Sequence, residues 1–447
     1  MNITIFHTND IHSYLSNYKK ITRYILDRKS KSKHNMYLDL GDHVDRSHPF
    51  TEATLGQANV ELLNEAQVDV VTIGNNEGIT LNFEDFNRLY DQAQFKITCC
   101  NLYDTDGHLP AHIQKSVIYE QQGITFGIVG ATAEFTPFYK ALGWHVTDPM
   151  QAIAEEINHL RSQVDVLIVL SHLGKFFDRT LAETHPEIDL ILGAHTHHYF
   201  EQGELVNGVL IGAAGRYGEF LGEVTLSFED KQLIKKTARL INTDDIRNIE
   251  DDYYQQGKAL LSEDITKNEI NLPRRLFSAS HTTYILADKL MQFTGGECAL
   301  INSGLIVNGY TGNHFTHYDL HKMLPHPINP VKITLTGREL KEIINVSQQH
   351  EYKDEIVKGF GFRGDIFGNY ILHNVGFIQS QQRYFIGTEE IDNHKKYQLA
   401  TLDMYTFGRF FPQFVQNEKE YYMPEFLRDL MKIAVKNNEY NLSTGES

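Results

Sequence analysis

Cysteine is scarce in this chain of 447 residues, which contains only Cys99, Cys100 and Cys298. Two of the three are adjacent and too constrained to pair easily, so no disulfide framework is expected. Such frameworks are typical of secreted domains, and a chain that lacks one fits a reducing compartment. The sequence therefore predicts a cytoplasmic protein.

Long apolar runs and an excess of basic residues are also missing. No run of about 18 apolar residues could cross a membrane, and the start MNITIFHTND lacks the regions of a signal peptide. The chain has 58 Asp and Glu residues against 41 Lys and Arg, a formal net charge of −17. Nucleic-acid polymers and anionic membranes are bound by clustered Lys and Arg, so neither is expected as a partner. An anionic small molecule would need a local cation, and the oligomeric state stays open.

Hydrophobic residues make up 41% of the chain, which at this length is enough for two cores. Short apolar runs such as ITIFHT, MYLDLG and VDVVTIG alternate with helix-compatible segments up to residue 235, which predicts a layered α/β domain over residues 1–235. Residues 236–274 are expected to be a connecting helix or linker, because 243–270 are acidic and helix-forming. The alternative that this helix is the first element of a second domain explains the sequence about equally well. The second domain itself is predicted over residues 275–447.

Potential metal ligands follow strand after strand in the first predicted domain. They are Asp10 and His12 after NITIFHTN, Asp42 after MYLDLG, Asn75 after VVTIG, His172 after VLIVLS, and His195 and His197 after LILGA. A single Asp or His in such a place is usually a turn or cap residue. Because open α/β layers bind ligands at the carboxyl ends of their strands, five such strand ends favour a shared site.

Oxygen and imidazole ligands without thiolates suit Mn²⁺, Zn²⁺, Co²⁺ or Fe. Seven side chains are too many for one tetrahedral ion and suit two divalent ions that share a bridging carboxylate. In such centres a metal-bound hydroxide attacks phosphorus while both ions stabilise the charged oxygens. The residues therefore predict two divalent metal ions as cofactors.

The ordered motifs D-x-H, GD, GN, SH and AHTH resemble those of the calcineurin-type metallophosphoesterases, specifically the 5′-nucleotidase family. The similarity continues through GAAGRYGEFLGEV at 212–224, NSG at 302–304 and LPHPINPVKITLTGREL at 324–340. The resemblance implies a four-layered αββα metallophosphoesterase domain followed by a smaller α/β substrate-binding domain. It also implies a joining helix about which the two domains can rotate.

The resemblance further implies how the ligands divide between the two ions. The first ion would take Asp10, His12, Asp42 and His197, and the second Asp42, Asn75, His172 and His195. Asp42 would bridge the two ions. Gly74 is expected to let the chain turn sharply enough to present Asn75.

One motif departs from the family pattern. Where the family reads GNHE followed by an aromatic residue and an Asp, this chain has Asn76 in place of the histidine and Ile79 in place of the aspartate. The acid of the family's dyad is therefore missing, although an amide at Asn76 can still donate a hydrogen bond. His43 and Arg46 are candidates to compensate for the missing acid. Arg46 could do so by binding a phosphate through two N–H groups of its planar guanidinium. A residue in such a loop is more often exposed to solvent than involved in catalysis, and this applies to both His43 and Arg46.

The second predicted domain departs as well. In the family an arginine follows the NSG element that begins here at Asn302, and its counterpart in this chain is Val307. The resemblance implies a base held between two aromatic residues. The candidates are Phe362, with Arg363 adjoining, and Tyr405 or Phe407. Aromatic residues in such loops pack in the hydrophobic core more often than they hold a base, so nucleotide binding is a hypothesis.

Two classes of function follow. The first is a dinuclear metal-dependent phosphohydrolase, similar to 5′-nucleotidases, that acts on nucleotides, nucleotide sugars or related phosphoesters in nucleotide catabolism. A cyclic-nucleotide phosphodiesterase would differ from it only in substrate. The second is a catalytically weak or idle relative that binds a ligand. The complete set of seven ligand positions favours the enzyme.

Overall fold

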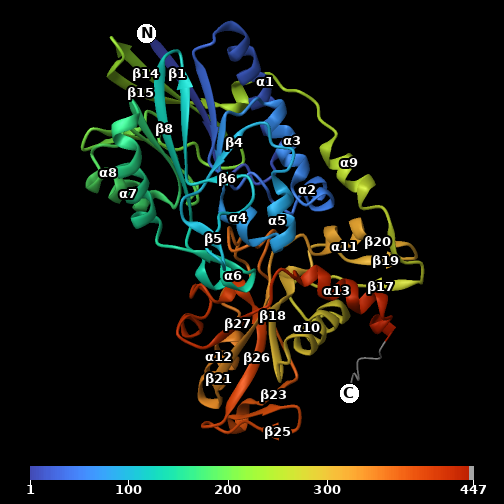
Figure 1. Ribbon diagram of the computed structural model, residues 1–447. Coiled ribbons are helices and arrows are strands. Elements are labelled where there is room, and N and C mark those ends of the chain that lie inside the picture. Colours follow the sequence, from blue (N-terminus) through green and yellow to red (C-terminus); the bar gives the residue numbers. More distant parts are fainter. Residues whose placement is uncertain (442–447) are drawn as a thin grey trace. The chain divides into compact units, whose positions relative to one another are not determined.

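A computed structural model describes residues 1–441, and the chain divides into two compact units, Met1–Gly257 and Lys258–Ser447 (Figure 1). Residue 235, the predicted end of the first domain, lies inside strand β15 (Gln232–Asn242). Helix α9 (Tyr253–Leu260) spans the division between the units. The predicted end of the second domain, residue 447, lies outside the described residues.

The first unit contains a seven-stranded sheet of order β15-β14-β1-β2-β3-β4-β6. The remaining strands are β1 (Asn2–Thr8), β2 (Asn35–Asp39), β3 (Val70–Thr72), β4 (Lys96–Thr98), β6 (Ile113–Gln114) and β14 (Phe220–Glu229). Strands β1, β2, β3, β4 and β6 are parallel, and β14 pairs with β1 in the antiparallel sense. The carboxyl ends of β1, β2 and β3 therefore meet at one edge.

A six-stranded sheet of order β12-β13-β11-β10-β8-β7 packs against the first. Its strands are β7 (Ser116–Gln121), β8 (Ile124–Thr132), β10 (Val166–His172), β11 (Leu190–Gly193), β12 (Glu204–Val206) and β13 (Val209–Gly212). Strands β8, β10, β11 and β13 run parallel to one another. A separate antiparallel pair joins β5 (Leu102–Asp104) to β9 (Trp144–Val146).

Helices cover the outer face of each sheet (Figure 1). The helices of this unit are α1 (Leu15–Lys31), α2 (Pro49–Thr54), α3 (Gln57–Glu65), α4 (Asn75–Ile79), α5 (Phe83–Leu89), α6 (Thr136–Ala141), α7 (Pro149–Leu160) and α8 (Lys175–Thr184). Helices α4 and α6 contact each other rather than either large sheet. In β10, Ile168 packs between the sheets while Val169 faces α7 and α8. Strands buried on both faces read as continuous apolar runs, as VLIVL does here. The predicted αββα layering is confirmed.

The second unit is built on a mixed sheet of order β22-β18-β26-β21-β27 with helices packed on it. Its strands are β18 (Cys298–Asn302), β21 (Pro330–Thr336), β22 (Tyr370–His373), β26 (Lys396–Leu402) and β27 (Lys419–Tyr421). Its helices are α10 (His281–Thr294), α11 (His317–Met323), α12 (Gly337–Gln349) and α13 (Leu427–Lys436). Smaller sheets contain β16 (Asp264–Thr266), β17 (Ile270–Leu272), β19 (Tyr310–Gly312), β20 (Phe315–Thr316), β23 (Val375–Ile378), β24 (Arg383–Ile386) and β25 (Glu389–Glu390). The predicted second α/β domain is therefore present.

The expected helix over residues 243–270 is wrong in extent. Only α9 is α-helical there, and β16 and β17 pair instead with β20 and β19. Near the start of the segment the side chain of Asn242 accepts a hydrogen bond from the backbone N–H of Asp244 at 2.9 Å. Such local bonds compete with helix formation, and the strand pairings are long-range contacts that composition does not reveal.

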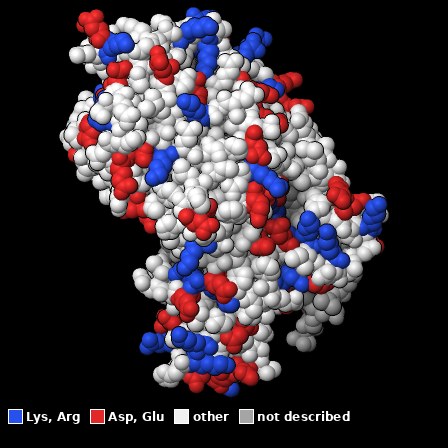
Figure 2. Space-filling model, viewed as in Figure 1, with Lys and Arg blue, Asp and Glu red and all other residues white. Residues whose placement is uncertain are grey.

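Charged side chains of both signs are interspersed on the face of the molecule that Figure 2 shows. Lys and Arg side chains are scattered there among Asp and Glu rather than gathered in a stripe. Within residues 1–441, no helix combines the length and apolar character needed to span a bilayer.

Candidate metal centre

Seven potential ligands converge at the carboxyl ends of five strands of the first unit. Strands β1, β2 and β3 come from one sheet, and β10 and β11 from the other. The residues are Asp10, His12, Asp42, Asn75, His172, His195 and His197. Parallel strands that end at one edge explain why residues so far apart in the sequence meet.

Two overlapping groups have donor atoms within 4.8 Å of one another. One contains Asp10, His12 and His197, and the other contains Asp10, Asp42 and His172. The oxygens of Asp42 face both groups, because Oδ1 lies 3.4 Å from His172 Nε2 and Oδ2 lies 3.6 Å from His12 Nε2. Next to them, Asn75 Oδ1 lies 2.9 Å from His195 Nδ1. The structure thus brings together all seven residues that the sequence singled out.

His172 gives the clearest sign of a cation site. Its Nδ1–H donates to the backbone oxygen of Leu40 at 2.7 Å, which leaves the lone pair of Nε2 facing carboxylate oxygens. That nitrogen is buried and has no hydrogen-bond partner among the described residues. A buried lone pair beside carboxylates is unfavourable unless a proton or a cation lies between them. The nitrogen and oxygen donors therefore fit a divalent ion.

The histidines differ in their electrostatics. Burial lowers the pKa of His172, but the carboxylates of Asp42 and Asp10 outweigh it and raise the pKa to about 10. Burial lowers the pKa of His195 to about 4 and that of His197 to about 3. Neutral imidazole is the form that binds a metal, so His195 and His197 are in the ligating state near neutral pH.

The backbone at the site is unusual. Five of the seven ligand candidates have positive φ: Asp10 (51°), His12 (45°), Asp42 (50°), His195 (73°) and His197 (55°). Non-glycine residues adopt this region uncommonly, and such conformations cluster at functional sites. The loops therefore hold these five residues in a strained backbone conformation that directs their side chains toward the site.

Gly74 is required for space rather than for a sharp turn. Its φ is −90°, which any residue can adopt. A Cβ at this position would lie 2.1 Å from Oδ1 of Asp42, so any other residue would collide with that carboxylate. The expected reason for this glycine was therefore wrong, although its importance to the site stands.

Glu77 is a structural residue that the sequence reasoning left without a role. Its buried carboxylate accepts hydrogen bonds from the backbone N–H groups of Asp42, Val44 and Gly74, each at 2.9 Å. Three such donors compensate a buried carboxylate. Glu77 thereby ties the loop after β2 to the loop after β3, the two loops that carry Asp42 and Asn75.

Asn76 and Asp45 both contact the ring of His12. Nδ2 of Asn76 donates to the backbone oxygen of Val44 and lies 3.1 Å from His12 Nδ1. Oδ2 of Asp45 lies 3.3 Å from the same nitrogen. An Nδ1–H donated to Asp45 leaves Nε2 of His12 free to face Asp10 and Asp42, which is how an outer carboxylate orients a ligand. The sequence analysis missed Asp45, whose only signal was its place in the loop after Asp42.

His43 and Arg46 do not occupy solvated loop positions. His43 is buried, with its ring 4.4 Å from that of Tyr18 and its Nδ1 3.1 Å from Nδ2 of Asn59. Burial lowers its pKa to about 3, so it is a neutral core residue rather than an acid at the site. Arg46 pairs with Glu52 at 2.8 Å and donates to the backbone oxygen of Thr80 at 2.7 Å.

Arg216 is a local cation that the sequence analysis did not single out. Its charge adds to burial and to His12 in lowering the pKa of His197. The guanidinium lies 4.6 Å from the ring centroid of Tyr217, whose backbone N–H donates to the backbone oxygen of Asp10. No carboxylate forms an ion pair with Arg216 in the part of the chain that the structure describes. The motif GRYG at 215–218, which follows β13, could have signalled it, because it belongs to the family-like element GAAGRYGEFLGEV.

The predicted substrate residues of the second unit are largely engaged in its core. Asn302 is fully buried, donates to the backbone oxygen of Phe367 at 2.6 Å, and accepts from the Tyr405 hydroxyl at 2.8 Å. Phe362 is buried and stacks on His326, with centroids 4.9 Å apart. The backbone N–H of Arg363 donates to His326 Nδ1. These contacts describe a packed interior rather than an open clamp.

Phe407 is the exception among these residues. Its side chain is 42% exposed, and its ring lies 5.6 Å from that of Phe360. Phe407 therefore has an aromatic neighbour in Phe360, two residues before the predicted Phe362.

Comparisons with known proteins agree with this geometry. The model of the calcineurin-like phosphoesterase family matches residues 3–199. The uncharacterized metallophosphoesterase YunD of Bacillus subtilis is 37% identical over 96% of this chain and 98% of its own. A 5′-nucleotidase of Diplobatis ommata is 23% identical, covering 54% of this chain and 48% of that protein. The solved structure of a 5′-nucleotidase precursor from Thermus thermophilus superposes with a TM-score of 0.61 at 18% identity, covering 98% of this chain and 97% of that one.

Proposed function

Because this chain belongs to the calcineurin-like metallophosphoesterases, with the two-domain architecture of their 5′-nucleotidase relatives, we propose that it is a dinuclear metal-dependent phosphohydrolase of small phosphoesters. Family membership supports the hydrolysis of phosphoester bonds. The two ions and the substrate class are the proposal. The observation that carries it is the position of Asp42, whose two oxygens face two different groups of ligands.

Each ion would be held by four residues. Asp10, His12, Asp42 and His197 would hold one, and Asp42, Asn75, His172 and His195 the other. The donors suit Mn²⁺, Zn²⁺, Co²⁺ or Fe. Such a pair of ions supplies Lewis acidity, which polarises phosphoryl oxygens and activates water.

The chain's own residues orient the site and neutralise charge. Asp45 orients the ring of His12 by accepting from its Nδ1–H, and Glu77 fixes the two loops that carry Asp42 and Asn75. Arg216 offers a planar guanidinium to the phosphoryl oxygens, which is the local cation that a chain of net charge −17 requires. Because no histidine stands at position 76, leaving groups that depart without protonation, such as those of phosphoanhydrides, are favoured.

Nucleotides and nucleotide sugars are the proposed substrates, in line with the 5′-nucleotidases among the relatives. The proposal extends to a role in nucleotide catabolism in the cytoplasm, with no nucleic-acid polymer as a partner. The three cysteines, all free and buried, support a reducing compartment.

Chromatographic detection of all hydrolysis products, both monophosphates and free phosphate, tests the proposal on metal-stripped protein to which Mn²⁺, Zn²⁺ or Co²⁺ is restored. The panel contains nucleoside monophosphates and diphosphates, nucleotide sugars, dinucleotides and cyclic nucleotides. Turnover is expected to depend on metal and to be fastest for phosphoanhydrides. Turnover of the cyclic nucleotides alone would identify a phosphodiesterase. If metal binds and no hydrolysis product of any substrate forms, the enzyme proposal fails and a ligand-binding role takes its place.

A further inference from the structure

Asp178 lies at a position of helix α8 where an apolar residue is expected. The buried residues of this helix are Asp178, Leu181 and Ala182, spaced as i, i+3 and i+4. Leu181 and Ala182 pack in the core beneath the six-stranded sheet, and a helix face that packs in this way is normally apolar. A carboxylate on such a face is unfavourable unless the fold compensates it, so a specific partner is expected.

His198 is that partner. Oδ2 of Asp178 lies 3.3 Å from Nε2 of His198, and the two side chains are 1% and 9% exposed. Neither atom has a hydrogen-bond partner elsewhere among the described residues. A Cβ on Gly193, the last residue of β11, would lie 2.2 Å from the same carboxylate oxygen, so a glycine at this position leaves room for the carboxylate. A buried imidazole and carboxylate at this distance interact strongly, because little water screens them.

His198 connects this carboxylate to the loop that carries two of the metal-ligand candidates. Thr196 stands between those two candidates in the sequence. Its Oγ1 accepts from the backbone N–H of Lys175 at 3.1 Å and lies 2.9 Å from Nδ1 of His198. The hydroxyl hydrogen of Thr196 is therefore available to Nδ1, which leaves the ring proton on Nε2, facing Asp178. The first turn of α8 thus holds the loop on both sides of His197.

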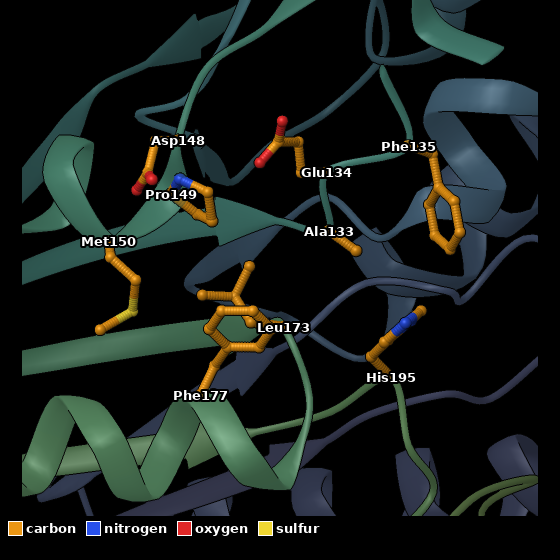
Figure 3. A pocket seen from close by; sticks show the side chains of 9 residues that line it. All are labelled: Ala133, Glu134, Phe135, Asp148, Pro149, Met150, Leu173, Phe177 and His195. Carbon is orange, nitrogen blue, oxygen red and sulfur yellow. The ribbon is translucent and has the colours of Figure 1, made fainter. Parts of the chain in front are cut away.

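The backbone conformation of this loop explains why it needs support. His195 and His197 both have positive φ, 73° and 55°, which is uncommon for residues other than glycine. Beside His195 close packing does not supply that support, because His195 and Phe177 of α8 line a pocket of about 420 Å³ (Figure 3). The polar contacts of Thr196 and His198 with α8 therefore help to keep the loop in its strained conformation.

We propose that Asp178 and His198 are positioning residues of the metal centre, which set the places of His195 and His197 through the loop that carries them. The inference rests on the proposed function, because it assumes that these two histidines bind metal. Since His195 would bind one ion and His197 the other, the pair supports both ions at once. Asp45, by contrast, orients a ligand of the first ion alone.

Metal binding by the full chain tests this role without any need for turnover. The affinity for Co²⁺ is measured by competition with a chelator in the parent chain, in Asp178→Ala, in His198→Ala and in the double variant. Each single variant should lower the affinity for both ions by roughly 10- to 100-fold. The double variant should bind about as weakly as either single variant, because the loss of one partner already breaks the pair. The visible absorption of bound Co²⁺ should also shift, since the imidazoles would approach it from altered positions.

Two further variants separate positioning from a purely structural role. Asp178→Asn keeps the shape of the side chain and an oxygen that can accept from Nε2–H, so it should lower the affinity by less than Asp178→Ala does. Glu187→Ala is the matched control, because this carboxylate lies 3.1 Å from His185 just beyond the other end of α8. It should change neither the affinity nor the absorption. The free energy of unfolding of each metal-free variant is measured as well. Unchanged affinity and absorption in the folded Asp178 and His198 variants, whatever their stability, would overturn the positioning role.

Hydrolysis by the parent chain distinguishes failure of this inference from failure of the proposed function. If the variants weaken metal binding while the parent chain hydrolyses no phosphoester, the proposed function fails and the positioning role stands. If the metal-loaded parent chain hydrolyses phosphoesters while the variants keep its Co²⁺ affinity and absorption, the function stands and the positioning role fails. A parent chain that binds neither Co²⁺ nor another divalent ion overturns both.

Discussion

Asn75 in the first unit and Asn302 in the second both lie at the carboxyl end of a buried strand, but their amides have different neighbours. Asn302 Oδ1 accepts from Tyr405, and its Nδ2 donates to Phe367 O, so protein groups satisfy both ends of the amide. Asn75 Nδ2 donates to Asn76 Oδ1, whereas Asn75 Oδ1 lies 2.9 Å from Nδ1 of His195, a ring nitrogen that can instead bind a cation. Close to this pair, the buried Nε2 of His172 has no hydrogen-bond partner among the described residues.

The same contrast holds beyond these two residues. In the first unit, the lone pair of His172 Nε2 and the carboxylates of Asp10 and Asp42 point toward a shared centre. In the second, Tyr405, Phe410 and Phe411 pack ring against ring. Polar groups whose partners are missing from the chain mark a binding site, whereas polar groups satisfied by the chain specify the fold.

Asp42→Ala should have the largest effect, because it removes a carboxylate whose two oxygens face different histidines, His12 and His172. Metal-dependent phosphate release should fall by about 10³-fold or more. The bound metal should also fall when measured on the purified variant. Asp91→Ala is the control, since that carboxylate pairs with His112 on the surface. Retention of most activity would contradict a centre that shares Asp42.

Asp45→Asn should act through His12 rather than through a bond to the metal. The affinity for metal, measured by competition with a chelator, should fall by roughly 10- to 100-fold. The free energy of unfolding of the metal-free chain should change little. Asp106→Asn, at an exposed position, is the control, and it should change neither the metal affinity nor the free energy of unfolding. A loss of stability with unchanged metal affinity would mean that Asp45 only supports the loop.

Asn76→His combined with Ile79→Asp should restore an acid to the site. Hydrolysis of phosphomonoesters with poor leaving groups should rise by about 10-fold or more, because general acids contribute in that step. Phosphoanhydrides should gain less. Ile79→Asp alone is the control, because an aspartate without the histidine has nothing to orient. An equal gain for both classes of substrate would argue against a missing acid.

Tyr405→Phe should give the smallest effect and one of a different kind. It leaves Asn302 Oδ1 buried without its donor, so the free energy of unfolding should fall by about 1–2 kcal/mol in a denaturant titration. The value of kcat/KM should stay unchanged. Tyr284→Phe, in the same unit but more exposed, should alter neither quantity. A lower kcat/KM with an unchanged free energy of unfolding would instead indicate that Tyr405 takes part in substrate binding.

The sequence was most informative where function depends on the ends of strands. Apolar runs predict β1, β2, β3, β10 and β11, and the residue types that follow them predict a metal site at one sheet edge. It was least informative for loop residues such as His43 and Arg46. Whether such a residue faces the site depends on its partners, Asn59 for His43 and Glu52 for Arg46, and no periodic pattern reports those contacts.

By itself the sequence determined the two-domain architecture, the αββα layers, the set of seven potential ligands and the replacement of the family's dyad by Asn76 and Ile79. The two-domain division and the seven ligands follow from local patterns of apolar runs and the residues that end them. The αββα layers and the replaced dyad follow from the resemblance to the 5′-nucleotidase family. The tertiary structure alone decided which polar groups are satisfied and which lack a partner. Asn302 and Tyr405 are 103 positions apart, and the space that Gly74 leaves open is set by Asp42 from a different strand. Such contacts form only when the chain packs. Only the folded chain therefore shows that the amide of Asn302 has both of its hydrogen-bond partners, whereas His172 Nε2 beside Asp42 has none among the described residues.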